Sequence, residues 1–330
     1  MTEALLSVEG LRTHFFTRAG AIKAVDDVSF EVGRGEVLGL VGESGSGKSV
    51  TGYSIIGLVD PPGRVVGGSI RYRDQDLVRL PAKALRRLRG NRIAMVFQDP
   101  MMTLNPVLSI ETQMVEAILA HQRLPHAAAV DRARAALVQV GIASPDARLA
   151  AYPHQFSGGM RQRVAIAIAL LNSPDLIIAD EPTTALDVTI QGQILFEMQK
   201  LIRDTGAALI WITHDLSVIA GLADRVCVMY AGRIVEQGTT EDVLGTPRHP
   251  YTRGLLDSVP GQAPEKTRLK QIPGMTPSLL DIGAGCAFRA RCSRATVTCE
   301  LTPEMTPIGG HEHALRCFHP LPETISIAEA

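Results

Sequence analysis

Residues 42–49 carry a glycine-rich loop of the pattern G-x-x-x-x-G-K-S, and this loop constrains the fold more than any other feature. It reads Gly42-Glu43-Ser44-Gly45-Ser46-Gly47-Lys48-Ser49, and we expect these residues, with Val50 directly after them, to bind the nucleotide. The apolar run 37–41 precedes the loop, and a stretch that begins at Val50 can continue as a helix. Because glycines let backbone N–H groups converge and a helix N-terminus attracts anions, this arrangement predicts a polyphosphate site. We expect Lys48 to reach the β- and γ-phosphates of a nucleotide and the Ser49 hydroxyl to ligate Mg²⁺.

The composition allows more than one domain and gives no sign of a polyanionic partner. The chain has 330 residues, of which 45% are hydrophobic, and 33 Lys and Arg balance 34 Asp and Glu. Residues 1–10 lack the sustained apolar core of a signal peptide, and the apolar run 164–171 is too short to span a bilayer. We therefore expect no nucleic-acid partner, and we expect any membrane role to come through another protein.

Hydrophobic patterning predicts an α/β core that is interrupted by helices. Residues 5–32 alternate in patches as strands of an antiparallel sheet do. Short apolar runs at 93–97, 176–179 and 208–213 are typical of buried strands. Residues 99–155, in contrast, have apolar positions at helical spacing and show no strand signal. This segment is expected to form a helical subdomain inserted between two strands of the core.

Polar residues follow the predicted core strands, at the sheet edge where ligands bind in open α/β folds. Asp180 and Glu181 end one strand, and because strand side chains alternate, they can take different roles. We expect Asp180 to hold Mg²⁺ and Glu181 to polarise a water for attack on the γ-phosphate. Gln98 can ligate Mg²⁺ and position that water, or it can cap a turn. His214 can hydrogen-bond the γ-phosphate, although strand-end histidines are often structural.

Two further features suit a nucleotide-binding protein. Ser157, Gly158, Gly159 and Met160 begin a predicted helix, where backbone N–H groups form a second anion site. A chain with one phosphate loop has no evident need for this second anion site. Phe15, upstream of the phosphate loop, can stack on a nucleobase, but from the residues alone an ordinary core or edge aromatic is favoured.

Together, and in this order, these features resemble an ATP-binding cassette, and over essentially all of its length the chain resembles the nucleotide-binding subunit of an ABC transporter. The resemblance implies an α/β P-loop NTPase core with an antiparallel β subdomain, an inserted helical subdomain and a C-terminal cysteine-bearing extension. The implied boundaries are 1–98 for the first part of the ATP-binding core, 99–165 for the helical subdomain ending in the signature motif, 166–258 for the second part of the core and 259–330 for the extension.

The resemblance also implies roles for individual residues. Phe15 would stack on adenine, and Gln98 would be the hinge glutamine that signals to membrane subunits. Residues 157–160 would contact ATP bound to the opposite subunit, and Asp187 would lie at the dimer contact. The signature motif commonly reads Leu-Ser-Gly-Gly-Gln, whereas here it reads Phe-Ser-Gly-Gly-Met from Phe156 to Met160. The serine and glycines that form the anion site are present, so only the contact made by the last side chain, Met160, differs.

A narrower resemblance comes from residues 98–106, 152–163 and 249–256, which look like the branch that serves dipeptide, oligopeptide and nickel uptake in bacteria. It implies an ATPase that couples ATP hydrolysis to peptide import at the cytoplasmic face of the inner membrane. The implied partners are a second ABC ATPase subunit (a related chain or a copy of this one), two membrane permease subunits and an external substrate-binding protein. Nickel import and a soluble, non-transport ABC ATPase are the alternatives.

Four of the five cysteines crowd into the tail, at Cys286, Cys292, Cys299 and Cys317. Without a secretion signal, clustered cysteines favour a metal site over disulfides. The absence of a C-x-x-C knuckle makes an iron–sulfur cluster, of the four-iron, four-sulfur ([4Fe-4S]) kind, competitive with zinc. The peptide-transporter branch has a similar tail. Reduced thiols that pack a small, loop-rich extension are the alternative.

Three tail histidines and the remaining cysteine complete the candidates. His311, His313 and His319 can substitute as metal ligands, but exposed loop histidines are the favoured interpretation. Cys227 lies in an apolar stretch and is expected in the core.

Overall fold

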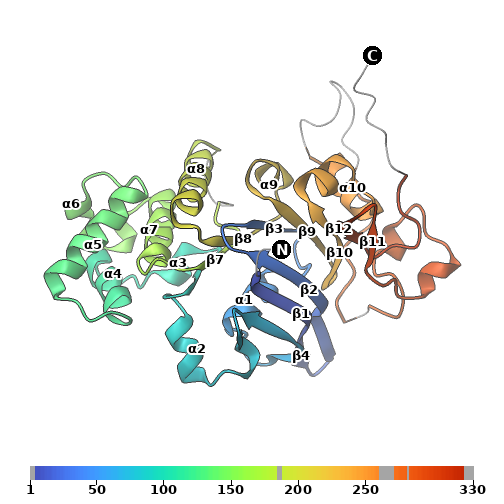
Figure 1. Ribbon diagram of the computed structural model, residues 1–330, viewed down its shortest axis with the longest axis horizontal. Coiled ribbons are helices and arrows are strands. Elements are labelled where there is room, and N and C mark those ends of the chain that lie inside the picture. The colour runs from blue at the N-terminus through green and yellow to red at the C-terminus, as the bar shows by residue number, and fades with distance from the viewer. Residues whose placement is uncertain (1–3, 184–187, 260–270, 281, 323–330) are drawn as a thin grey trace, which may run out of the picture. The chain divides into compact units, whose positions relative to one another are not determined.

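The computed structural model describes residues 4–183, 188–259, 271–280 and 282–322 (Figure 1). The chain divides into two compact units, each assembled from segments that are distant in sequence. Unit 1 comprises Met1–Leu5, Val32–Glu36 and Arg79–Trp211, and unit 2 comprises Leu6–Glu31, Val37–Val78 and Ile212–Ala330.

Unit 1 combines buried parallel strands with a group of helices. Strands β6 and β7 pair in parallel with Ile93 opposite Leu176, and all five residues of β7 are buried, as the apolar run at 176–179 predicts. Helices α4 to α7, green in Figure 1, pack on one another. The elements are α2 (Ala82–Leu88), β6 (Ile93–Val96), α3 (Pro100–Thr103), α4 (Ile110–Leu119), α5 (His126–Gln139), α6 (Pro145–Leu149), η2 (Pro153–Gln155), α7 (Gly158–Leu170), β7 (Leu176–Asp180), α8 (Val188–Thr205) and residues 208–211 of β8 (Ala208–Thr213).

Helix α4 begins at a serine that caps it. The Ser109 hydroxyl accepts the N–H of Thr112 at 3.2 Å and so caps α4. Alanines on one face of α5 are buried, among them Ala129 and Ala133. The prediction of helices in residues 99–155 is therefore confirmed.

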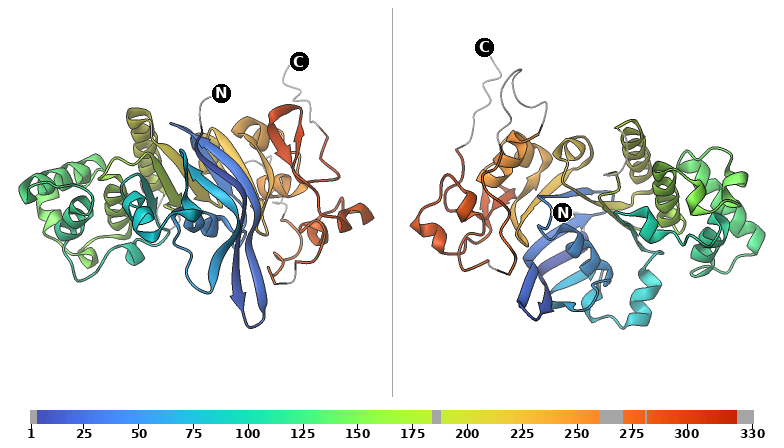
Figure 2. Two further views of the ribbon diagram at one scale, coloured as in Figure 1. Left: turned by 60° about the horizontal axis from the view of Figure 1, so that its bottom comes forward. Right: turned by 180° about the vertical axis from the view of Figure 1, so that it is seen from behind.

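Unit 2 contains two groups of strands. The antiparallel sheet has the order β2-β1-β4-β5 with Leu6 opposite Tyr72, which confirms the strands predicted in residues 5–32. The second group has the order β11-β12-β10-β9-β3, in which β3 and β9 run parallel and the other neighbours are antiparallel. Figure 2 shows the long ribbon of β1 and β2. The elements are β1 (Ala4–Thr17), β2 (Gly20–Gly33), β3 (Val37–Val41), α1 (Lys48–Ile56), β4 (Gly63–Tyr72), β5 (Gln75–Asp76), η1 (Leu77–Arg79, mostly in this unit), α9 (Leu216–Leu222), β9 (Arg225–Tyr230), β10 (Arg233–Thr239), η3 (Glu241–Gly245), α10 (Pro250–Asp257), η4 (Arg289–Arg291), η5 (Val297–Glu300), β11 (Thr306–Ile308) and β12 (Gly310–Leu315).

The tail is more regular than a loop-rich extension. Strand β12 pairs with β10 so that Glu236 lies opposite Leu315, and β11 pairs with β12. An aromatic cluster joins the tail to the core of unit 2, since the ring centroid of Phe288 lies 5.3 Å from that of Tyr230 and 5.4 Å from that of Tyr251. The tail thus packs as part of unit 2.

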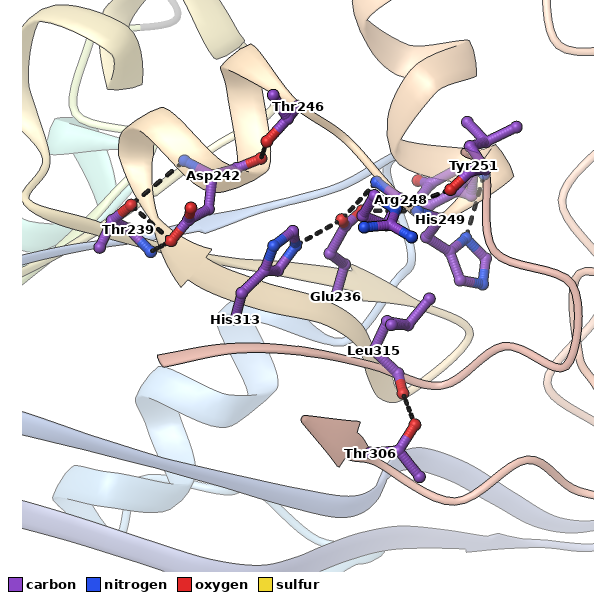
Figure 3. Close-up of polar contacts among 11 residues, drawn as sticks. Glu236, Thr239, Asp242, Thr246, Arg248, His249, Tyr251, Thr306, His313 and Leu315 are labelled. Atoms are coloured by element: carbon purple, nitrogen blue, oxygen red, sulfur yellow. Dashed lines mark hydrogen bonds and ion pairs between the residues drawn. The ribbon is translucent and has the colours of Figure 1, made fainter. Parts of the chain in front are cut away.

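A buried carboxylate links β10, β12 and the start of α10 (Figure 3). Glu236 is 0% exposed and accepts the backbone N–H groups of Arg248 at 2.7 Å and His249 at 3.0 Å. The Nε2 atom of His313 lies 2.9 Å from the same carboxylate. The interpretation of His313 as an exposed loop histidine was therefore wrong: its side chain is buried on β12 against a carboxylate.

Candidate functional site

The predicted phosphate loop connects β3 to α1 in unit 2. Gly42, Gly45 and Gly47 have φ angles of 150°, 78° and 103°. A Cβ atom at Gly47 would lie 2.2 Å from the carbonyl oxygen of Ala24, so the loop conformation requires glycine there. The strand, loop and helix therefore follow one another as a phosphate site requires.

The Lys48 side chain folds over this loop. Its Nζ atom donates to the carbonyl oxygens of Gly42 at 2.8 Å and Glu43 at 3.0 Å, and the residue is only 4% exposed. Ser44 and Gly45 form the exposed tip of the loop. A cation held by loop carbonyls can exchange these bonds for phosphate oxygens, so the Lys48 ammonium suits the predicted role.

The Glu43 side chain is held by residues from the C-terminal part of unit 2. Arg291 donates two hydrogen bonds to the carboxylate, at 2.6 and 3.0 Å, and the Thr276 hydroxyl donates a third at 3.2 Å. The Tyr251 hydroxyl accepts the backbone N–H of Glu43 at 2.8 Å. The hydrogen bond from Arg291 holds the pKa of the Glu43 carboxyl below its usual value. These partners were missed, because Arg291 and Glu43 are 248 positions apart and no local pattern joins them.

Unit 1 carries the predicted catalytic acids. Asp180 is the buried last residue of β7. Glu181 follows with a φ of 44°, a left-handed value that is uncommon outside glycine and often occurs at functional sites. The Gln98 amide donates to the Glu181 carboxylate at 3.1 Å. The residue predicted to position water and the residue predicted to polarise it are therefore in direct contact.

The Ser157 segment forms the start of α7, as the sequence predicts. The Ser157 hydroxyl accepts the N–H of Met160 at 3.3 Å and caps the helix. Ser157 and Gly158 are exposed, and a Cβ atom at Gly158 would meet no described atom within 4 Å. Gly159 lies in the first turn. Such an open helix N-terminus is a suitable position for an anion.

Of three further predicted site residues, the structure describes two. Phe15 lies on β1, and a Cβ atom added to Gly63 would come within 2.5 Å of its ring. This ring packs closely on the backbone at Gly63, and its stacking on adenine stays a prediction. His214 is exposed directly after β8. Asp187 lies outside the described residues.

The four tail cysteines line one cavity beside α10, together with His319. All four are free thiols, and burial raises the pKa of Cys286 and Cys292, and that of Cys317 to about 11. Two sulfurs accept backbone N–H groups, from Arg294 to Cys292 at 3.4 Å and from His319 to Cys317 at 3.3 Å.

Lining one cavity does not by itself group these cysteines as metal ligands. Within the described parts of the chain, no three or more His, Cys, Asp or Glu side chains are grouped so that they could hold a metal ion.

Cys227, the cysteine outside the tail, is fully buried on β9, which confirms its predicted place in the core. Among the described helices, none has the length and apolar character needed to cross a membrane.

Two protein families match separate stretches of this chain. Residues 25–184 match the family described as ABC transporter, and residues 235–299 match the family described as oligopeptide/dipeptide transporter, C-terminal region. The chain is 47% identical over 321 residues to the dipeptide transport ATP-binding protein DppD of Haemophilus influenzae, with 97% of each chain covered. It is 45% identical over 326 residues to the oligopeptide transport ATP-binding protein OppD of Escherichia coli, with 98% of this chain and 95% of that protein covered.

A solved structure is also similar. It is the dimeric post-hydrolysis state of the ATP-binding cassette MJ0796 bound to ADP and Pi, which shares 26% identity and a TM-score of 0.65 with this chain. The similarity covers 71% of this chain and 98% of that one.

Proposed function

This chain belongs to the ABC transporter family, as the ATP-hydrolysing subunit of a peptide importer, and we propose that residues 42–49 bind its ATP while Glu181 acts as the base of hydrolysis. The observation that carries the proposal is the hydrogen bond from Gln98 to Glu181, because it joins an amide that can orient water to a carboxylate that can accept its proton.

The proposed reaction is an in-line attack of water on the γ-phosphate. Gln98 orients the water, and Glu181 takes its proton as the new O–P bond forms and the bond to the leaving ADP breaks. Lys48 and His214 donate hydrogen bonds to phosphate oxygens and so stabilise the charge that develops there. Each of these groups supplies position or charge, which is what phosphoryl transfer chiefly needs from a protein.

We assign Mg²⁺ to the Ser49 hydroxyl, the Gln98 amide oxygen and the Asp180 carboxylate. These are hard oxygen donors of the kind Mg²⁺ prefers, and the buried Asp180 carboxylate is a group whose negative charge favours a cation as partner. When bound, the ion neutralises charge on the phosphates.

We infer the partners of this chain from its membership of the same family. We propose that two ATPase subunits, related chains or copies, close around two ATP molecules, with residues 157–160 of one subunit facing ATP on the other and Asp187 near the contact. The open N-terminus of α7 supports this role, since Ser157 and Gly158 are exposed there and a helix N-terminus suits an anion from another molecule. Two permease subunits and an external substrate-binding protein complete the importer, and the chain would lie peripherally on the cytoplasmic face of the inner membrane.

Glu181→Gln tests the assignment of the base. The variant should bind ATP with near-normal affinity, hydrolyse it very slowly and accumulate closed dimers, because the amide keeps the shape but cannot accept the proton. Glu116→Gln, an exposed change on α4, is the matched control and should hydrolyse ATP normally. Near-normal hydrolysis by Glu181→Gln would exclude Glu181 as the base.

We also propose an iron–sulfur cluster as the ligand of Cys286, Cys292, Cys299 and Cys317. The four sulfurs line one cavity and two of them accept N–H groups, as cluster thiolates do, but among the described residues they are not grouped as metal ligands, so binding requires the thiols to lose their protons and draw together. When bound, a cluster would supply a redox-active cross-link between distant parts of the tail.

Anaerobic purification with iron, sulfide and visible-absorption analysis tests this ligand. Iron and sulfide should be present in the wild-type protein and lost in Cys286→Ser/Cys292→Ser. The proposal is wrong if the wild-type protein is colourless and free of metal and the double substitution leaves its stability unchanged. The cysteines would then serve only in packing.

A further inference from the structure

Glu43 places a carboxylate within a loop that has to receive a polyphosphate. Its side chain is one-quarter exposed, and its own carbonyl oxygen lies 3.0 Å from the Lys48 ammonium. A negative charge at this position opposes the binding of phosphate groups, and the opposition is strongest where water is partly excluded. The loop therefore needs a compensating charge.

Arg291 supplies that charge in a fixed geometry. Its side chain is 5% exposed, and its two terminal nitrogens meet the two Glu43 oxygens at 2.6 and 3.0 Å. The Nε atom donates to the carbonyl oxygen of Pro273 at 2.9 Å, and the guanidinium lies over the rings of Tyr230 and Phe288 at 5.8 and 6.0 Å. With both edges of its fork bonded, the guanidinium has one orientation.

The Glu43 backbone is fixed from the same part of the chain. Its N–H donates to the Tyr251 hydroxyl at 2.8 Å. Tyr251 lies in the first turn of α10, whose start is held by the hydrogen bonds of Arg248 and His249 to Glu236 (Figure 3). Both the side chain and the main chain of Glu43 are therefore held by residues that follow position 250.

We propose that Arg291 is a positioning residue for ATP, which neutralises Glu43 and fixes the first part of the phosphate loop, so that nucleotide affinity depends on the cysteine-bearing tail. This inference rests on the proposed role of residues 42–49 as the ATP site. It goes beyond that role because Arg291 belongs to η4 in the tail and acts on ATP only through Glu43.

The test is equilibrium binding of ATP to the full chain, measured without turnover. Arg291→Met should weaken ATP binding about tenfold, because it leaves the Glu43 charge uncompensated beside the phosphates. Glu43→Gln/Arg291→Met should recover affinity to within about threefold of the wild type, since the charge to be neutralised is gone. A residue that served folding alone would show no such recovery.

Two further variants are controls. Arg289→Met lies on the same short helix, but its side chain is 44% exposed and pairs with Glu300, so ATP affinity should not change. Arg291→Lys keeps the charge but loses the two-pronged contact, and it should bind ATP several-fold more weakly than the wild type. It also serves as the test variant if Arg291→Met does not fold.

The outcomes separate this inference from the proposed function. Lys48→Ala should abolish ATP binding, and normal binding by that variant would overturn the ATP site itself. If Lys48→Ala fails to bind while Arg291→Met and Arg291→Lys bind like the wild type, the inference about Arg291 alone is wrong. It is equally wrong if the double variant binds as weakly as Arg291→Met.

Discussion

Replacing His249 by asparagine should make this protein less sensitive to acid. The His249 side chain is 1% exposed and caps α10, because its Nδ1 atom accepts the N–H of Tyr251 at 3.0 Å. A proton on Nδ1 would remove that acceptor. An asparagine side chain can also cap a helix, but it does not titrate.

The magnitude follows from the pKa of His249. Burial lowers this pKa from 6.5 to about 4, although the nearby Glu236 carboxylate acts in the opposite direction. Between these two values the unfolded chain binds a proton that the folded chain does not, so the free energy of unfolding falls as the pH falls from 6.5 towards 4. The contribution is fully present above pH 6.5, and about 3 kcal/mol is lost by pH 4.

Urea unfolding at about pH 7 and about pH 4.5 measures this loss. The asparagine variant should start less stable at neutral pH, because it loses the packing of the ring against Phe288, but its stability should fall by about 2 to 3 kcal/mol less between the two conditions. His126→Asn, at the exposed start of α5, should behave like the wild type. Equal losses in the wild type and in His249→Asn would refute the reasoning.

Three other substitutions probe the described geometry. Gly47→Ala should abolish ATP binding and lower the melting temperature, because the new Cβ would lie 2.2 Å from the Ala24 carbonyl oxygen. Ser157→Ala removes the cap of α7 and should cost about 1 kcal/mol in urea unfolding; an unchanged midpoint would contradict this. Glu236→Gln leaves one polar contact with either a backbone N–H or His313 unmatched and should cost about 1 to 3 kcal/mol, measured in the same way.

Local patterns predicted most of the secondary structure and the phosphate loop. The loop is set by glycines whose positive φ angles are a local requirement, and β7 is set by a continuous apolar run. The contact of Gln98 with Glu181 was partly foreseeable, because both were expected at the edge where parallel strands end.

Contacts between distant segments could not be predicted from local sequence patterns. Nothing near Glu43 indicates that an arginine in the tail will pair with it, and nothing near His313 indicates a buried carboxylate on β10. The tail is rich in proline and glycine, and this composition concealed the pairing of β12 with β10. Such pairings depend on the folded neighbour rather than on the local sequence.

Strand β12 has a consequence for how this protein behaves at high concentration. Strand β10 has β9 on one side and β12 on the other, so its backbone N–H and C=O groups are covered along both edges where these strands pair. A sheet edge left open is a template on which another chain can add a strand. A shortened form that lacks β11 and β12 would present β10 as such a template, together with the Glu236 carboxylate that His313 now covers. We therefore expect a form trimmed of β11 and β12 to self-associate through the open edge of β10.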